Sequence, residues 1–167
     1  MTNVLFTSAK EIKQICGIGG NIDPDKIRPF IVLAQDQDLQ KLLGTQLYSE
    51  MIRRARASTI TGHYQTLLND WIKPFLAFKT TAKFIKVGGY SVANEGLTRH
   101  QPDSAIPLEF REVISLSEEY DNSADFYAGR LYEYLCVNQQ SFPEFNEIQQ
   151  GDIKRDSQTY FSGFQFK

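Results

Sequence analysis

Residues able to carry acid–base or nucleophilic catalysis are few in this chain of 167 residues, and their spacing matches no catalytic pattern. Histidine is the most common general base of enzymes, but His63 and His100 stand in no recognisable motif. The Gly-Ile-Gly-Gly segment at 17–20 follows a predicted helix and lacks the Lys-Ser/Thr pair of a phosphate-binding loop. We therefore expect a protein that is not an enzyme.

Residues that bind metals or form disulfides are also sparse. Cys16 and Cys136 are too few for a disulfide framework or a zinc site. Asp36 and Asp38 are two positions apart, and on a helix this spacing points them to different faces. The sequence therefore predicts no metal centre and no cofactor.

Lysines on one stripe of a predicted helix are candidates for binding. Lys79, Lys83 and Lys86 are separated by four and three residues, so a helix places them on one side. Contact with DNA phosphates needs only correctly placed charge, so the stripe is a possible channel or acidic-partner contact. A short lysine stripe is equally typical of a solvated helix face. The same two interpretations hold for an earlier basic group, Arg53, Arg54 and Arg56.

The last 29 residues, 139–167, are rich in aromatic residues but show no helical or strand periodicity. Disordered segments are poor in aromatics, so we expect this segment to lie on a surface. In an extended arm, alternate side chains would fill pockets beside a sheet edge. That surface belongs to a neighbouring chain, which we favour, or to the arm's own domain. The candidate partner-binding residues are Phe142, Phe145, Tyr160, Phe161, Phe164 and Phe166.

Charge is divided unevenly along the chain. Residues 1–100 hold 13 Lys and Arg against 8 Asp and Glu, a net charge of +5. Residues 101–167 hold 5 against 12, a net charge of −7, and the whole chain carries −2. Copies of such a chain can join head to tail through opposite charges. The charges can equally neutralise each other within one fold.

The elements that position these residues are mainly helices. A capping box at residues 8–11 predicts one helix start, and the Asp-Pro pair at 23–24 predicts another. Pro29 falls inside the second helix, which we expect to kink or restart there. A short helix at 38–43 and a longer one at 45–57 follow.

Two long helices are predicted in the second half of the chain. Residues 62–87 show strong helical periodicity, and Pro74 should bend that helix. Residues 90–100 are typical of two short strands around a turn. Residues 107–137 form the second long helix, which residues 121–123 and Gly129 weaken and could break in two. Its predicted apolar seam repeats every seven residues at Val113, Tyr120, Tyr127 and Tyr134, with Ala124 and Leu131 between them.

The sequence thus predicts a mainly α fold. We expect a small helical bundle over residues 1–140, with a short inserted β-hairpin or loop at about 89–106. Residues 141–167 are expected to form an extended arm rich in aromatic residues and glutamine. No apolar run approaches the ~20 residues of a membrane span. The N-terminus lacks the pattern of a secretory signal, so we expect no membrane partner.

Blocks of distinctive sequence are spread over residues 20–145. They stand at residues 21–36, which begin Asn-Ile-Asp-Pro-Asp-Lys-Ile; at 42–48, Leu-Leu-Gly-Thr-Gln-Leu-Tyr; at 62–74; at 127–136, which begin Tyr-Ala-Gly-Arg-Leu-Tyr; and at 142–145, Phe-Pro-Glu-Phe. These blocks resemble the head–tail connector proteins of tailed bacteriophages, also called adaptor or head-completion proteins. The likeness is closest to versions from phages of Bacteroidota hosts.

The resemblance implies a structural role without catalytic residues. Such connectors are small helical bundles with an inserted loop or hairpin. They form a ring, dodecameric in the family, between the portal protein and the tail, and they extend the DNA channel. The implied location is the virion, after assembly in the host cytoplasm. The implied partners are other copies of the chain, the portal, a tail or further connector protein, and DNA passing through the channel. Residues 146–167 match no part of the family pattern.

Other functions are compatible with parts of the sequence. A tail-completion or tail-terminator protein is one alternative, although such proteins tend to be rich in β-strands. A small DNA-binding packaging protein is another, although a pI of about 5.7 argues against it.

Overall fold

The structure is a computed structural model that describes residues 4–19, 21–88, 90–93, 96–99 and 110–146. The first half contains α1 (Ala9–Cys16), α2 (Pro24–Ala34), the π-helical segment η1 (Gln35–Leu39), α3 (Gln40–Leu43) and α4 (Thr45–Arg56). The second half contains α5 (His63–Thr66), the π-helical segment η2 (Leu67–Ile72), α6 (Lys73–Val87), β1 (Tyr90–Ala93), β2 (Gly96–Arg99), α7 (Phe110–Val137), the 3₁₀ segment η3 (Gln139–Ser141) and α8 (Pro143–Asn146).

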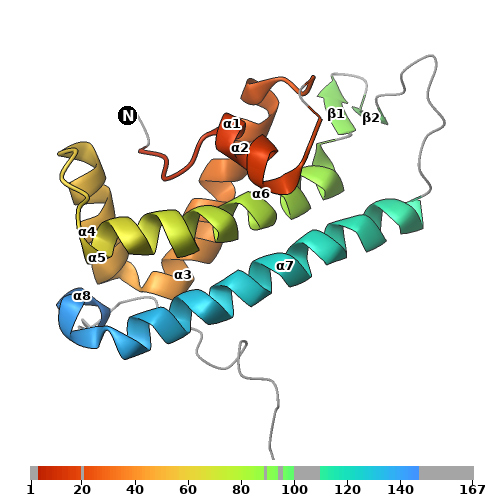
Figure 1. The fold of residues 1–167 in the computed structure, drawn as a ribbon. Helices are drawn as coiled ribbons and strands as arrows, with labels where there is room; N and C mark the ends of the chain where they lie inside the picture. Colours follow the sequence, from red (N-terminus) through yellow and green to blue (C-terminus); the bar gives the residue numbers. More distant parts are fainter. Residues whose placement is uncertain (1–3, 20, 89, 94–95, 100–109, 147–167) are drawn as a thin grey trace, which may run out of the picture.

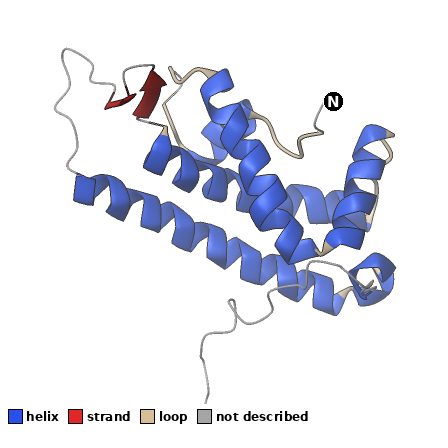
Figure 2. Ribbon diagram, turned by 180° about the vertical axis from the view of Figure 1, so that it is seen from behind, coloured by secondary structure: helices blue, strands red, loops and turns tan. Residues whose placement is uncertain are grey.

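Helix α6 is the centre of the bundle. It packs along α7 on one side and against α1 and α2 on the other, as Figure 1 shows. Helices α6 and α7 run antiparallel, and the strands β1 and β2 lie at the end of the bundle where α6 finishes. Seen from behind in Figure 2, this hairpin and α8 occupy opposite ends of α7. The fold is therefore a small, mainly helical bundle, as the sequence predicts.

A large apolar cluster joins η2, α6 and α7 to α3, α4 and α8. Its fully buried members include Leu47, Met51, Phe75, Leu76 and Leu131. A smaller cluster holds α1 and α2 against α6 through Ile12, Ile27, Ile31 and Ala77. Full burial of one Leu or Phe side chain contributes about 1.5–3 kcal/mol, so these clusters hold the elements in place.

Local signals in the sequence set several helix ends. The side chain of Ser8 accepts a hydrogen bond from the backbone N–H of Glu11, whose carboxylate accepts one from the backbone N–H of Ser8. This is the predicted capping box. The side chain of Asp23 likewise accepts from the N–H of Asp25 at the start of α2. Gly44 separates α3 from α4 with φ of 76°, a conformation that favours glycine.

Prolines interrupt these helices less than expected. Pro29 lies within α2, which runs without a break from Pro24 to Ala34, so the predicted restart is wrong. Pro74 has no N–H to donate, and its ring would crowd a carbonyl group one turn earlier in an α-helix. The wider segment η2 immediately precedes it, and this keeps the path from α5 to α6 continuous.

Helix α7 is unbroken across residues 121–123, contrary to the predicted weakness there. The predicted seam is confirmed at Ala124 and Leu131, which are fully buried, but not at its tyrosines. The tyrosines are half-buried at the edges of the contact, where the ring of Tyr127 stacks on Phe78 with centroids 5.4 Å apart. The fully buried line is made of smaller residues, which allow α6 to approach closely: Ser117, Ala124, Ala128, Leu131 and Leu135.

The inserted hairpin agrees with the sequence prediction. Strands β1 and β2 pair antiparallel, with Tyr90 opposite Arg99 and Ala93 opposite Gly96. The predicted loop that continues to residue 106 lies outside the described residues.

Candidate interaction surfaces

The structure describes one of the two histidines considered as general bases. His63 is exposed at the start of α5, where its ring meets the edge of Phe142. His100 lies outside the described residues. In the described part of the chain, no group of three or more His, Cys, Asp or Glu side chains is arranged to hold a metal ion. The search for membrane-spanning helices, limited to the same residues, finds none long and apolar enough.

Lys79 points from α6 toward acidic residues of α7. Its Nζ lies 2.5 Å from Oδ1 of Asp121 and 3.8 Å from Oδ1 of Asp125. Burial disfavours the charged ammonium, but the hydrogen bond to Asp121 and the nearby carboxylates outweigh it and raise the pKa of Lys79. Burial, opposed by Lys79 and reinforced by Asp121, raises the pKa of Asp125. The lysine is thus held as a cation between two helices.

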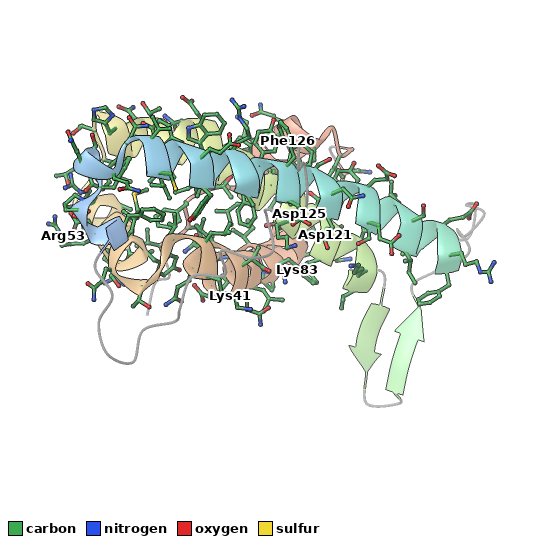
Figure 3. All side chains as sticks on the ribbon, turned by 90° about the horizontal axis from the view of Figure 1, so that it is seen from below. Lys41, Arg53, Lys83, Asp121, Asp125 and Phe126 are labelled. Atoms are coloured by element: carbon green, nitrogen blue, oxygen red, sulfur yellow. The ribbon has the colours of Figure 1, made fainter. Side chains whose placement is uncertain are left out.

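The other lysines of the stripe also face acidic groups of this chain. Nζ of Lys83 lies 3.0 Å from Oδ2 of Asp38 in η1, and Nζ of Lys86 lies 3.9 Å from Oδ2 of Asp121. Figure 3 shows Asp121 and Asp125 on the side of α7 that faces Lys83. Lys79 and Lys86 therefore meet acidic residues of the second half of the chain, whereas Lys83 pairs with Asp38 of its own half. Lys79 and Lys83 are each paired with an aspartate of the same chain. This argues against a fully solvated stripe and against a DNA contact for these two lysines.

Two residues assigned to the arm belong to the core. Phe142 is fully buried, with its ring centroid 5.0 Å from that of Tyr64 and 5.9 Å from that of Tyr134. Phe145 is 2% exposed and contacts the ring of Tyr132. The expectation that these two phenylalanines bind a partner is wrong, because η3 and α8 fold back onto the bundle. The other arm candidates, Tyr160, Phe161, Phe164 and Phe166, lie outside the described residues.

A hollow on the outer side of α4, which sequence reasoning missed, combines apolar and basic side chains. We call it the α4 hollow; it has a volume of about 600 Å³ and is lined by Tyr48, Ser49, Ile52, Arg53, Arg56 and Ala57. A smaller hollow of about 170 Å³ shares Tyr48, Ile52 and Arg56 with it and reaches Val4 and Leu5. The spacing of these residues along the sequence indicates that they share one side of α4. The sequence does not show that this side is exposed.

A buried glutamine fixes the wall of this hollow. Oε1 of Gln35 accepts a hydrogen bond from the backbone N–H of Phe6, and its Nε2 donates to the carbonyl of Val4 and to the hydroxyl of Tyr48. The Tyr48 hydroxyl in turn donates to Asp36 at 2.7 Å. Burial and this hydrogen bond raise the pKa of Tyr48 to about 12. The N-terminal segment, η1 and α4 are thereby held in one arrangement.

The side of α7 that faces away from the bundle carries a second exposed surface. We call it the outer face of α7, and it comprises Glu119, Phe126, Glu133 and Val137. Glu119 and Glu133 are each seven residues from Phe126, and Val137 is eleven residues from it. These spacings place all four residues on one side of the helix. Phe126 is 63% exposed and Val137 is 83% exposed, so two apolar side chains of this face are largely open to solvent. Figure 3 shows Phe126 on the edge of α7 opposite to Asp121.

Comparison with protein families supplies one match. A family model described as a family of unknown function, DUF6712, matches residues 39–155, which is well over half of the chain. The chain belongs to the DUF6712 family. No curated protein and no solved structure was found to match it.

The DUF6712 match covers the elements that carry both exposed surfaces. Helices α4 and α7 lie entirely within residues 39–155, as do η2, α6 and the hairpin. Helices α1 and α2 precede the matched region, so the DUF6712 segment contains most of the larger core cluster, without Phe6 and Ala34, and only part of the smaller one. The α4 hollow and the outer face of α7 are therefore features of the family segment of this chain.

Proposed function

We propose that this DUF6712 chain is a structural subunit of a head–tail connector in a tailed bacteriophage. In this proposal it is one copy of a ring that joins the portal to the tail and extends the DNA channel. The observation that carries the proposal is the agreement between the sequence blocks and the architecture. The blocks resemble connector proteins, and the chain has the helical bundle with an inserted hairpin that this resemblance implies.

The fold also weighs against one alternative. Tail-terminator proteins tend to be rich in β-strands, whereas the described part of this chain is mainly helical. A role in DNA binding has lost its main candidates, because Lys79 and Lys83 are paired with aspartates of the same chain. In the proposed connector, DNA passes through the ring without relying on these two lysines.

Assembly is the proposed mechanism. Each subunit contributes modest contacts to its neighbours, to the portal and to a tail component. When many subunits bind one ring, these contacts act together and the assembly is far tighter than any single contact. Residues 147–167, with Tyr160, Phe161, Phe164 and Phe166, keep the role of a partner-binding segment in this proposal.

The proposal is tested by counting the protein in purified phage particles from the source. Quantitative mass spectrometry should find this chain and the portal protein in a ratio near one to one. That ratio is expected if each portal subunit carries one connector subunit. Absence of the chain from intact particles would overturn the proposal.

A shortened chain tests the role of the last residues. A chain that ends at Asn146 keeps every described residue, including the buried Phe142 and Phe145, so it should fold. Its circular dichroism spectrum should remain helical, while electron microscopy of particles should show no connector ring. Normal rings from the shortened chain would remove residues 147–167 from the assembly contacts.

A further inference from the structure

The outer face of α7 has the composition of a docking surface. Phe126 stands at its centre, and Glu119 and Glu133 follow two helical turns away on either side, about 10 Å along the axis. The nearby basic residue Arg130 lies over the ring of Trp71, 5.5 Å from its centroid. An exposed aromatic side chain flanked by carboxylates is thus presented on a rigid helix. Binding surfaces of this kind concentrate their energy in one aromatic anchor.

The α4 hollow has the complementary composition. Tyr48 and Ile52 supply apolar surface, and two arginines stand at its rim. Arg53 shares the carboxylate of Glu50 with a neighbouring arginine. Arg56 is exposed and has no acidic partner among the described residues. The hollow therefore combines apolar side chains with a net positive charge, because Glu50 is shared by two arginines and Arg56 is exposed.

We propose that the outer face of α7 of one copy docks in the α4 hollow of a second copy. Phe126 enters between Tyr48 and Ile52, and the glutamates of the outer face approach the arginines of the rim. The signs of charge agree with this pairing, since the helix face is acidic and the hollow is basic. This inference rests on the proposed ring and specifies which surfaces of neighbouring subunits meet.

The arrangement also produces the required symmetry. The two surfaces lie on different helices, and Figure 3 shows Arg53 at one end of the molecule and Phe126 farther along α7. One copy can therefore use its α7 face with one neighbour and its α4 hollow with another. Such a head-to-tail contact repeats from subunit to subunit and gives a ring when the rotation closes.

Disulfide trapping in the full chain tests the contact. A Ser49→Cys chain is mixed with an Asn122→Cys chain in a glutathione redox buffer; both positions are exposed, and Asn122 lies one turn from Phe126. The control mixture replaces the second chain with Gln65→Cys, an exposed position on α5. The docked pair should give at least about fivefold more mixed dimer than the control, because the contact raises the local thiol concentration. Native Cys16 and Cys136 are common to both mixtures.

Charge reversal sharpens the same measurement. Arg56→Glu in the Ser49→Cys chain should lower the yield about three- to fivefold, as expected for a charge pair near a surface. Glu119→Arg with Glu133→Arg in the Asn122→Cys chain should do the same, and combining the reversed chains should restore the yield. Equal yields in the docked and control mixtures, or no restoration, would overturn the inference.

A third mixture tests whether the 147–167 segment, in place of α7 of a second copy, occupies the hollow. If Ser162→Cys is trapped by Ser49→Cys in place of Asn122→Cys, the 147–167 segment fills the hollow and the inference is wrong. Failure of the proposed function is recognised separately. A chain present in particles at the portal ratio but without specific trapping keeps the connector role and loses this contact. A chain absent from particles but trapped specifically keeps the contact and loses the connector role.

Discussion

The two faces of α7 use similar residue types in opposite ways. Toward α6, the carboxylates of Asp121 and Asp125 meet Lys79, and small apolar residues are fully buried. On the outer face, glutamates and the ring of Phe126 are exposed to solvent. The inner face fixes the position of α7 in the fold, whereas the outer face adds nothing comparable to stability. The comparison teaches that exposure, more than residue type, separates folding residues from candidate binding residues.

The largest expected difference concerns two phenylalanines. Phe142→Ala removes a fully buried ring that packs against Tyr64 and Tyr134, so the free energy of unfolding should fall by about 3–5 kcal/mol. The matched change Phe126→Ala on the outer face should cost less than about 0.5 kcal/mol. Chemical denaturation followed by circular dichroism measures both. Similar losses for the two variants would show that the outer face of α7 is part of the folding core.

The next effect separates a paired lysine from an exposed one. Lys79→Met leaves Asp121 and Asp125 together without their cation, and the free energy of unfolding should fall by about 1–3 kcal/mol. Lys41→Met is the control, because Lys41 is exposed on α3 and should change stability by less than about 0.5 kcal/mol. The same denaturation experiment applies. If Lys79→Met matched its control, the lysine stripe would again be a solvated surface open to partners.

The carboxylates that face Lys79 should differ from each other. Asp121 accepts the short hydrogen bond from Lys79 and also lies near Lys86. Asp121→Asn should therefore lower the free energy of unfolding by about 1 kcal/mol at low salt, and added salt should reduce the difference. Thermal unfolding at two ionic strengths measures this. A difference that is independent of salt would contradict an electrostatic origin.

The smallest expected effect has the opposite sign. The pKa of folded Asp125 is raised, so this group contributes stability below its unfolded pKa and loses it as pH rises through the folded pKa. At neutral pH, Asp125→Asn should raise the free energy of unfolding by on the order of a few tenths of a kcal/mol, because a half-exposed carboxylate is screened by solvent. The gain should shrink as the pH falls through about 4 and vanish near about pH 2, where the carboxyl is protonated in both states. If Asp125→Asn lowered the free energy of unfolding at pH 7, the predicted direction of the effect would be wrong.

Much of the fold follows from local signals in the sequence. The capping box at Ser8, the Asp23 cap and the positive φ of Gly44 each act within a few residues, so the sequence alone identifies those helix ends. The helical periodicity before and after Pro74 also predicts one long helical path. The π-helical segments were not predictable, because each depends on how the flanking turns pack against other helices.

Long-range pairing is the part that the sequence leaves open. Lys79 and Asp121 are 42 positions apart, and nothing in the sequence around either residue indicates that the two will pair. The same holds for Phe142, whose neighbour Tyr64 is distant in the chain but whose sequence surroundings are typical of an arm. The α4 hollow depends on Gln35 holding the N-terminal segment beside Tyr48. Such features arise only when the helices are packed together.

The segment η2 sets the rotational phase between the beginning and the end of the central helix. A one-residue deletion within Leu67–Ile72 is absorbed when the wide turn becomes an α-helical turn, but a one-residue insertion would rotate everything before it by about 100° relative to α6. Tyr64 would then turn away from Phe142, and α5 would lose its place against α8. Insertions in this segment should therefore be tolerated less than substitutions, because they change the rotational position of α5 relative to α8.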